Sequence, residues 1–254
     1  MEKIFDSHAH YDDSRFDGDR DDLLLRLQGE VCGIINCASH LDSARFSLRL
    51  AEQYDYVYAA VGIHPHEAAE ASATWEEELY ALAQHKKAVA IGEIGLDYHY
   101  DFSPRDVQRK VFEKQLDIAK ELSLPVIIHD REAHGDMYDI LSSRKDLSGV
   151  IHCFSGSVEL ARQTVDMGMY IGLGGAVTFK NARVPVEVAQ YIPLDRLLLE
   201  TDAPYMTPVP YRGKRCDSSH IALTAQKIAD VKGITVDELL KVTRQNVERL
   251  FGLK

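Results

Sequence analysis

Short apolar segments alternate with longer amphipathic segments along the whole chain. The short segments have the length of β-strands, and several of them, such as residues 126–128, are continuously apolar and β-branched. That composition is typical of parallel strands whose two faces are both buried. The predicted strands are residues 3–8, 33–37, 56–62, 88–93, 125–129, 150–153, 169–172 and 196–201.

The longer segments have the spacing of amphipathic helices. Apolar residues recur at helical intervals over residues 103–122, which form the clearest predicted helix. We expect Ser103 to cap this helix and Pro104 to occupy its first turn. Two more helices are predicted near the end of the chain, at residues 218–232 and 236–243.

The alternation of eight strands with helices favours a closed TIM (β/α) barrel over an open sheet. The length of 254 residues is the usual size of one such barrel. The sequence contains no linker, low-complexity segment or repeat, so one domain is predicted over residues 1–254. The Pro- and Gly-rich residues 203–213 form a predicted long loop after the last strand, where such barrels build active sites.

The chain is acidic, with 29 Lys and Arg against 40 Asp and Glu, and its formal net charge is −11. A general electrostatic clamp on nucleic acid is therefore unfavourable, and phosphate binding must come from a few basic residues or from metal ions. The four cysteines contain no Cys-x-x-Cys pair, which argues against a zinc ribbon. Free thiols, with no signal-like or membrane-length apolar segment, predict a cytoplasmic protein that does not contact membranes. We expect it to be a monomer.

Histidines and carboxylates recur at the carboxyl ends of the predicted strands. The first strand ends at His8 and His10, and side chains two residues apart on a strand point the same way. In a barrel, the strand ends form one rim, so these groups are expected to lie close together. Burying so many polar groups together is costly without a cation. The candidate metal ligands are His8, His10, Glu93, His129, His152 and Asp202.

Six ligands exceed the number that one zinc ion usually takes from a protein, so we predict two divalent ions. The assignment is His8, His10 and Asp202 to one ion, His129 and His152 to the other, and Glu93 as the bridge. Such ions make hydroxide available near neutral pH, and Glu93 and Asp202 are the predicted catalytic residues, with Asp202 as general base. The histidines favour zinc or another transition ion, while magnesium and manganese stay open.

Several residues near these strand ends are candidates for holding a phosphate backbone. They are His64, His66, Arg131, Arg212, Lys214 and Arg215. The alternatives are a supporting role behind the ligands for the two histidines, and an ordinary solvated surface for the basic residues. Tyr205 and Phe154 can stack on a base, although packing within loops is the commoner role of such aromatics. Asp97 is placed to orient a ligand, whereas Asp6 is expected to make a structural hydrogen bond.

At these residues the sequence resembles the TatD family of metal-dependent hydrolases. The matching motifs are DSHAH at residues 6–10, VGIHPH at 61–66, GEIGLDY at 92–98, PVIIH at 125–129, HCFSG at 152–156 and LETDAP at 199–204. The resemblance implies a TIM barrel, the same six metal ligands and a deoxyribonuclease that is commonly magnesium-dependent and often a 3′–5′ exonuclease. The chain departs from the family at Cys216-Asp217, where the family commonly has Asn and an acidic residue, so its fine specificity is open.

The leading hypothesis is therefore a two-metal phosphodiesterase that acts on single-stranded DNA or on 3′ ends. The first alternative is hydrolysis of another small phosphoester, a lactone or a cyclic amide. Many barrels with those activities bridge their metals with a carboxylated lysine, and this chain has Glu93 where that lysine is expected. The second alternative is a metal-stabilised scaffold without activity, which the complete set of predicted ligands disfavours.

Overall fold

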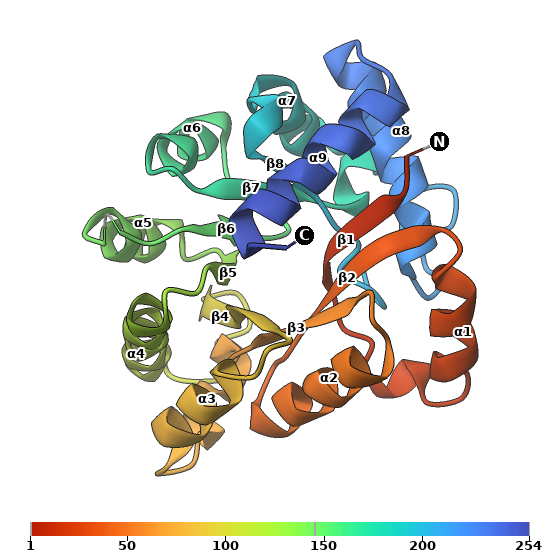
Figure 1. Cartoon of the computed structure of the whole chain (residues 1–254). Helices are drawn as coiled ribbons and strands as arrows, with labels where there is room; N and C mark the ends of the chain where they lie inside the picture. The colour runs from red at the N-terminus through yellow and green to blue at the C-terminus, as the bar shows by residue number, and fades with distance from the viewer. Residues whose placement is uncertain (1, 145, 254) are drawn as a thin grey trace.

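The computed structural model describes residues 2–144 and 146–253, and its strands form one parallel sheet in sequence order (Figure 1). An isolated parallel bridge joins Ala9, at the end of the first strand, to Ala203, in the segment after the last strand, so the sheet closes into a TIM barrel, as predicted. The strands are β1 (Ile4–Ala9), β2 (Val31–Cys37), β3 (Val57–Val61), β4 (Ala88–Asp97), β5 (Val126–Arg131), β6 (Gly149–Ile151), β7 (Tyr170–Leu173) and β8 (Leu197–Leu199).

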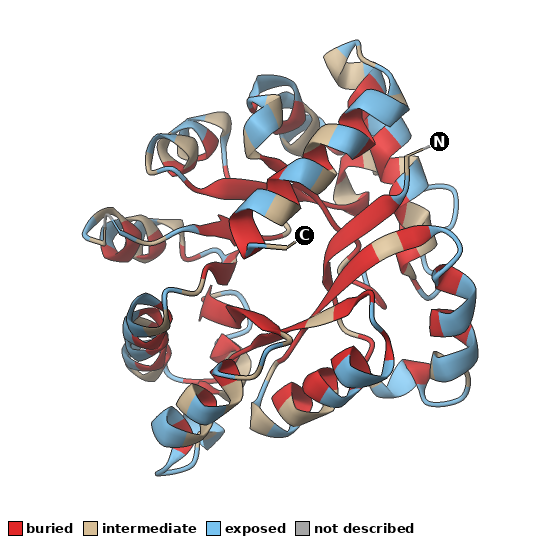
Figure 2. Ribbon diagram, in the orientation of Figure 1, coloured by how far each residue is buried: buried red, intermediate tan, exposed pale blue. Residues whose placement is uncertain are grey.

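Helices surround the sheet and turn their apolar sides toward it, so the buried residues concentrate in the strands and on the inner helix faces (Figure 2). The α-helices are α1 (Arg20–Leu27), α2 (Leu41–Gln53), α3 (Trp75–Ala83), α4 (Arg105–Leu122), α5 (His134–Ser142), α6 (Val158–Asp166), α7 (Arg183–Tyr191), α8 (Ile221–Lys232) and α9 (Val236–Phe251). Five short 3-10 helices are η1 (Ser14–Phe16), η2 (Pro65–Glu70), η3 (Gly175–Thr178), η4 (Leu194–Arg196) and η5 (Ser218–His220).

The start of α4 corrects the predicted cap. Pro104 is the N-cap residue, and no side chain caps the helix. The Ser103 hydroxyl instead donates to the carbonyl oxygen of His66 at 2.9 Å and accepts the N–H of Ala69 at 3.0 Å. Ser103 therefore ties the segment before α4 to η2, which follows β3.

The last helix is longer than predicted, because α9 continues to Phe251 instead of ending at residue 243. Its final turns bring Val247, Leu250 and Phe251 into an apolar cluster with strand residues such as Phe5 and Ile35. The helix crosses in front of the sheet in Figure 1 and covers the amino-terminal end of the barrel. The three residues after position 243 are all polar, so the apolar spacing did not predict the last two turns of the helix.

At the opposite end of the barrel, β4 and β5 approach each other closely beside His129. Gly95 has φ 148°, and a Cβ atom at this position would lie 1.9 Å from the carbonyl oxygen of His129. Only glycine fits this approach. The pairing continues to Asp97 opposite Arg131, so β4 is longer than the predicted strand 88–93.

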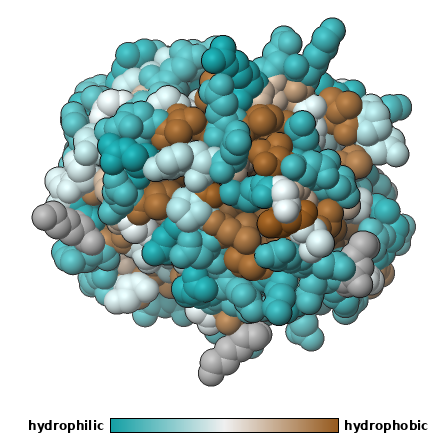
Figure 3. All heavy atoms as spheres, turned by 90° about the horizontal axis from the view of Figure 1, so that it is seen from above, coloured by the Kyte–Doolittle hydropathy of each residue, from teal (hydrophilic) through white to brown (hydrophobic). Residues whose placement is uncertain are grey.

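The side of the molecule seen in Figure 3 is largely hydrophilic, with apolar residues gathered near its middle. Of the helices in the described parts of the chain, none is long and apolar enough to cross a membrane.

Candidate metal centre

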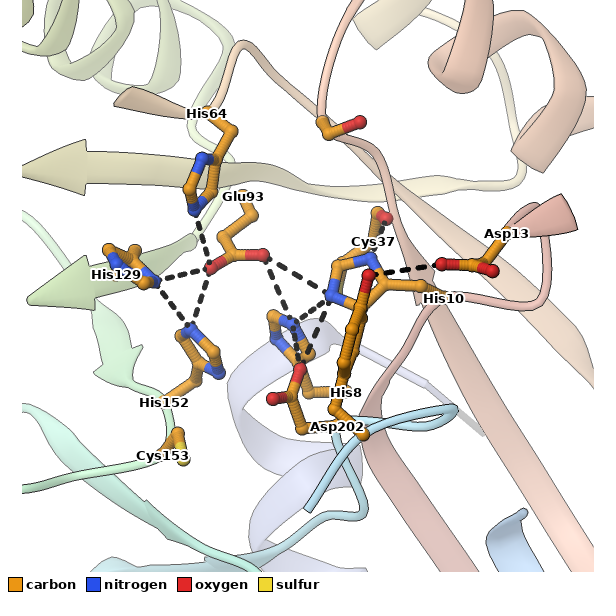
Figure 4. Close-up of polar contacts among 12 residues, drawn as sticks. His8, His10, Asp13, Cys37, His64, Glu93, His129, His152, Cys153 and Asp202 are labelled. Atoms are coloured by element: carbon orange, nitrogen blue, oxygen red, sulfur yellow. Dashed lines mark hydrogen bonds and ion pairs between the residues drawn. The ribbon is translucent and has the colours of Figure 1, made fainter. Parts of the chain in front are cut away.

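The six predicted metal ligands converge at the carboxyl ends of the strands, around the buried side chain of Glu93 (Figure 4). Glu93 lies on β4 and His129 on β5, while His152 directly follows β6. His8 lies on β1, with His10 just beyond its end, and Asp202 lies three residues after β8. The barrel thus brings together residues that are far apart in sequence.

One carboxylate oxygen of Glu93, Oε2, faces the first predicted ion position. It lies 3.3 Å from His8 Nε2 and 3.4 Å from His10 Nε2. These two nitrogens are 3.0 Å apart. Asp202 Oδ1 lies 3.4 Å from His10 Nε2 and 3.8 Å from His8 Nε2. His8, His10 and Asp202 form one group of donors close enough to hold an ion.

The other oxygen of Glu93, Oε1, faces a second group of histidines. It lies 2.7 Å from His152 Nε2 and 2.9 Å from His129 Nδ1, and these nitrogens are 3.4 Å apart. His64 Nε2 also approaches Oε1, at 3.4 Å. His64 was predicted as a substrate contact. The segment after β3 instead brings its ring next to Glu93. One carboxylate therefore lies between two pairs of histidines, which meet where the His8 and His152 rings stack with their centroids 3.8 Å apart.

Hydrogen bonds on the far side of the rings determine which nitrogens present lone pairs to the centre. His10 Nδ1 lies 2.8 Å from the carbonyl oxygen of Cys37, which can only accept, so in the neutral His10 ring Nδ1 carries the proton and Nε2 the lone pair. His129 Nε2 lies 3.0 Å from Asp97 Oδ2, which leaves the lone pair of the neutral ring on Nδ1. Lone pairs aimed at a carboxylate repel it, so these neutral rings fit a bound cation.

His64 has the opposite arrangement. It is the N-cap residue of η2, and its Nδ1 accepts the backbone N–H of His66 at 3.2 Å. A neutral ring that accepts through Nδ1 carries its proton on Nε2. His64 therefore directs an N–H toward Glu93 Oε1, which suits a hydrogen-bond donor better than a metal ligand.

Asp97 lies behind the second histidine group, where it was expected to orient a ligand. Its Oδ2 is 3.0 Å from His129 Nε2 and 2.9 Å from His66 Nε2. Its Oδ1 accepts the backbone N–H groups of Tyr100 at 2.8 Å and His99 at 3.0 Å. Burial raises the pKa of Asp97, but these hydrogen bonds outweigh it and hold that pKa well below its usual range.

Asp6 holds the first histidine group in place through structural hydrogen bonds, as expected. Its Oδ2 accepts from the hydroxyls of Thr201 at 2.6 Å and Ser218 at 2.7 Å. Its Oδ1 accepts the backbone N–H of Thr201 at 3.0 Å. The Asp202 N–H in turn donates to the His8 carbonyl oxygen at 3.0 Å. These bonds join β1 to the segment after β8, and so place His8 beside Asp202.

Asp202 itself has φ 59°, in the left-handed region that aspartate tolerates better than most residues. Such a conformation costs on the order of 1–3 kcal/mol and is common at functional sites, where the surrounding contacts enforce it. Here the contacts to β1 hold the strained residue with its carboxylate in the centre.

Glu200 is a buried carboxylate that was not among the candidate residues predicted from the sequence. Its Oε1 accepts the backbone N–H of Cys153 and lies 4.0 Å from His152 Nδ1. Within the described ranges, Glu200 Oε2 and His152 Nδ1 have no hydrogen-bond partner. Burial raises the pKa of Glu200 to about 8. A Cβ at Gly172 would lie 2.3 Å from Glu200 Oε2, so the glycine leaves room for this carboxylate.

The charges of the centre are strongly coupled. Burial raises the pKa of Glu93, but the nearby His152, His64 and His8 lower it well below its usual range. Burial opposes protonation of His10, yet Asp202 and Glu93 raise its pKa to about 10. The pKa of His129 is raised to about 9 by Asp97 and Glu93, again against burial. Without an ion, protons balance the carboxylates, and a metal ion must displace them.

The predicted phosphate-binding residues lie in different surroundings. Arg215 pairs with Asp19 through contacts of 2.6 and 2.7 Å and also donates to the Arg15 carbonyl oxygen, so it anchors the loop after β8 to the start of α1. The Arg212 guanidinium carbon lies 3.6 Å from the centroid of the Phe179 ring. Lys214 is exposed. Contact of these residues with substrate stays a prediction.

The two predicted stacking residues also differ. Phe154 is buried, which fits packing within the protein. Tyr205 is 47% exposed, and its ring centroid lies 6.5 Å from that of His10. Its hydroxyl donates to Asp13 at 3.1 Å, and the Arg15 guanidinium carbon lies 3.9 Å from the ring centroid. One side of the Tyr205 ring is therefore already covered.

Comparison with known proteins decides the family. The model of the family described as TatD related DNase matches residues 5–252. This chain belongs to that family. The predicted resemblance is confirmed, and the chain is a TatD-family metal-dependent hydrolase.

Relatives support the assignment over nearly the whole chain. The uncharacterized metal-dependent hydrolase YabD of Bacillus subtilis is 43% identical and covers 98% of this chain and 99% of its own length. The 3'-5' ssDNA/RNA exonuclease TatD of Citrobacter koseri is 35% identical, with 98% and 99% covered. The crystal structure of YJJV, a TatD homolog from Escherichia coli, matches with a TM-score of 0.93 and 33% identity, covering 99% of this chain and 98% of that one.

Proposed function

We propose that this TatD-family hydrolase is a divalent-metal-dependent exonuclease that degrades single-stranded DNA from its 3′ end. The observation that carries the proposal is the position of Glu93, whose two carboxylate oxygens face different histidine groups. That arrangement suits two ions bridged by one carboxylate. Hydrolytic enzymes use two neighbouring metal ions of this kind to cleave phosphodiesters.

The substrate class is supported by the relatives. The proteins from Citrobacter koseri and Shigella flexneri that are named 3'-5' ssDNA/RNA exonuclease TatD are 35% and 36% identical to this chain. Their names include RNA as well as DNA, so RNA is part of the test. The burial of His8, Glu93 and His152 at the rim of the barrel also favours a strand end over the interior of a duplex.

In the proposed centre, His8, His10 and Asp202 would hold one ion and His129 and His152 the other, with one oxygen of Glu93 available to each. Divalent ions held there supply water of lowered pKa and neutralise charge on a phosphoryl group. Zinc, manganese and magnesium are the candidates, since imidazole suits the first and carboxylates the other two.

Asp202 is the proposed proton acceptor, and His64 is a proposed hydrogen-bond donor to the substrate. Asp202 presents Oδ1 to His8 and His10, which leaves Oδ2 to accept a proton from the attacking water. His64 directs its Nε2 proton into the centre, where it can donate a hydrogen bond to a phosphate oxygen. The net charge of −11 requires local attraction for DNA, and the bound ions provide most of it.

The test is release of nucleotides from single-stranded DNA and RNA oligonucleotides labelled at the 5′ or 3′ end, with magnesium, manganese or zinc. We expect stepwise shortening from the 3′ end by the native protein. Asp202→Asn should lower the rate at least about 10²-fold, as loss of a general base does. Asp195→Asn makes the same chemical change at an exposed position of η4 and should leave the rate unchanged.

Failure of the native protein to cleave any oligonucleotide, or equal cleavage by Asp202→Asn, would overturn the proposal. Turnover of small phosphoesters, lactones or cyclic amides far above that of DNA would favour the first alternative. The cytoplasmic location and the monomeric state stay predictions.

A further inference from the structure

Two large aromatic side chains are exposed together in the segment between β4 and α4. Tyr100 is 50% exposed and Phe102 is 67% exposed. Their rings are stacked, with centroids 5.3 Å apart and an interplanar angle of 25°. Exposed apolar rings forgo the stabilisation that burial gives, so a stacked exposed pair needs an explanation.

The backbone of this segment is fixed by hydrogen bonds. The Tyr100 N–H donates to Asp97 Oδ1 at 2.8 Å. Asp101 accepts from the Arg105 guanidinium, with the shortest contact at 2.6 Å. Ser103 is tied to η2 by the two bonds that replace its predicted capping role. The rings are therefore held at the surface by an ordered backbone.

The aromatic pair adjoins the metal centre through His66. The His66 ring centroid lies 4.8 Å from that of Phe102 and 5.4 Å from that of Tyr100, in edge-to-face arrangements. His66 Nε2 contacts Asp97 Oδ2, which also contacts the His129 ring. One imidazole and one carboxylate thus separate the exposed rings from a proposed metal ligand.

A positive charge accompanies the rings. The Arg131 guanidinium carbon lies 5.4 Å from the Tyr100 ring centroid. Over residues 2–144 and 146–253, Arg131 makes no ion pair, whereas neighbouring Glu132 is paired with His99 at 2.8 Å. An unpaired guanidinium next to exposed rings complements a ligand that has both a phosphate and an aromatic base.

We propose that Tyr100 and Phe102 form a stacking subsite for a nucleobase next to the scissile phosphate, with Arg131 contacting the adjoining backbone. The inference rests on the proposed function for its substrate class. Stacking of this kind tolerates every base, because each base has a π face. Such stacking favours binding of a single strand over a duplex, because the bases of a duplex are already paired and stacked on each other.

The test compares the double variant Tyr100→Ala, Phe102→Ala with Tyr191→Ala, which removes a similarly exposed tyrosine, 45% exposed, at the end of α7. Binding of a fluorescent single-stranded DNA octamer and of its abasic analogue is measured by anisotropy in the Asp202→Asn background with magnesium. The KM and kcat for octamer hydrolysis are measured in the otherwise native background.

We expect the double variant to weaken octamer binding and raise KM by about tenfold or more, as loss of base stacking does elsewhere, with kcat little changed. The abasic octamer should bind equally weakly to the double variant and to the protein with the native aromatic pair. Tyr191→Ala should match the protein with the native aromatic pair on both ligands. Equal octamer binding by the double variant, or an equal loss on the abasic octamer, would overturn the subsite. Because binding is measured apart from cleavage, absence of cleavage with base-dependent binding would overturn the proposed function alone.

Discussion

Asp97 Oδ2 lies 3.0 Å from His129 Nε2, and this contact leaves Nδ1 of the neutral His129 ring as the nitrogen that faces Glu93. The other oxygen of Asp97 accepts two backbone N–H groups. The carboxylate therefore has a fixed orientation, and it sets the tautomer of a proposed metal ligand.

Replacing Asp97 by asparagine tests this relationship. In Asp97→Asn the backbone N–H groups retain the oxygen, so the amide NH₂ faces His129 and moves the ring proton to Nδ1. We expect zinc affinity, measured by isothermal titration calorimetry, to fall by about 10–100-fold. Asp136→Asn is the matched control, because Asp136 bonds Tyr98 and Arg109 and contacts no proposed ligand. Unchanged affinity in Asp97→Asn would contradict the assignment.

His64 provides a second test, since it approaches Glu93 but carries its neutral proton on the facing nitrogen. His64→Ala should leave metal affinity and stoichiometry little changed while lowering oligonucleotide hydrolysis by about 10²-fold or more. His129→Ala, which removes a proposed ligand, should lower both. A loss of one bound ion in His64→Ala would show that His64 is itself a ligand.

The raised pKa values of His10, about 10, and His129, about 9, predict how metal binding depends on pH. Both exceed the usual value of about 6.5, so both rings are protonated in the metal-free protein at neutral pH. An ion needs the unprotonated rings, so binding releases protons and strengthens as pH rises toward about 9 and 10, where the metal-free rings lose their protons. Calorimetry in buffers of different ionisation enthalpy measures the release. Binding without proton release at pH 7 would contradict the predicted charge state.

We expect two of the basic residues in the loop after β8 to contact substrate and the third to hold the loop in place. Arg212 and Lys214 lack carboxylate partners in the described ranges, whereas Arg215 is paired with Asp19. Arg212→Ala and Lys214→Ala should each weaken oligonucleotide binding and reduce the slope of log affinity against log salt by about 0.7, as for one lost phosphate contact on a single strand. Arg215→Ala should lower Tm with little change in that slope. A slope change only in Arg215→Ala would reverse this assignment.

The sequence predicted the barrel and the convergence of the six ligands for one physical reason. Parallel strands carry the residues at their carboxyl ends to a common rim, so His8 and Asp202 meet although nearly the whole chain separates them. Continuous apolar strands and the strand-end histidines are visible without knowledge of any contact.

Features that depend on side-chain partners could not be predicted in the same way. The tautomer of His64 follows from its position at the start of η2, and the pairing of Arg215 with Asp19 joins distant loops. Tyr100 and Phe102 are visible in the sequence as two aromatics between a predicted strand and a predicted helix, but that position alone does not distinguish a binding surface from packing. Only their exposure in the folded chain distinguishes them from core residues.

Anomalous diffraction from crystals of the protein grown with zinc or manganese shows directly whether Glu93 lies between two bound ions. We expect two peaks, one near His8, His10 and Asp202 and one near His129 and His152, about 3.5–4 Å apart with Glu93 between them. A single peak at full occupancy, or two peaks that Glu93 does not contact, would contradict a binuclear centre bridged by this carboxylate.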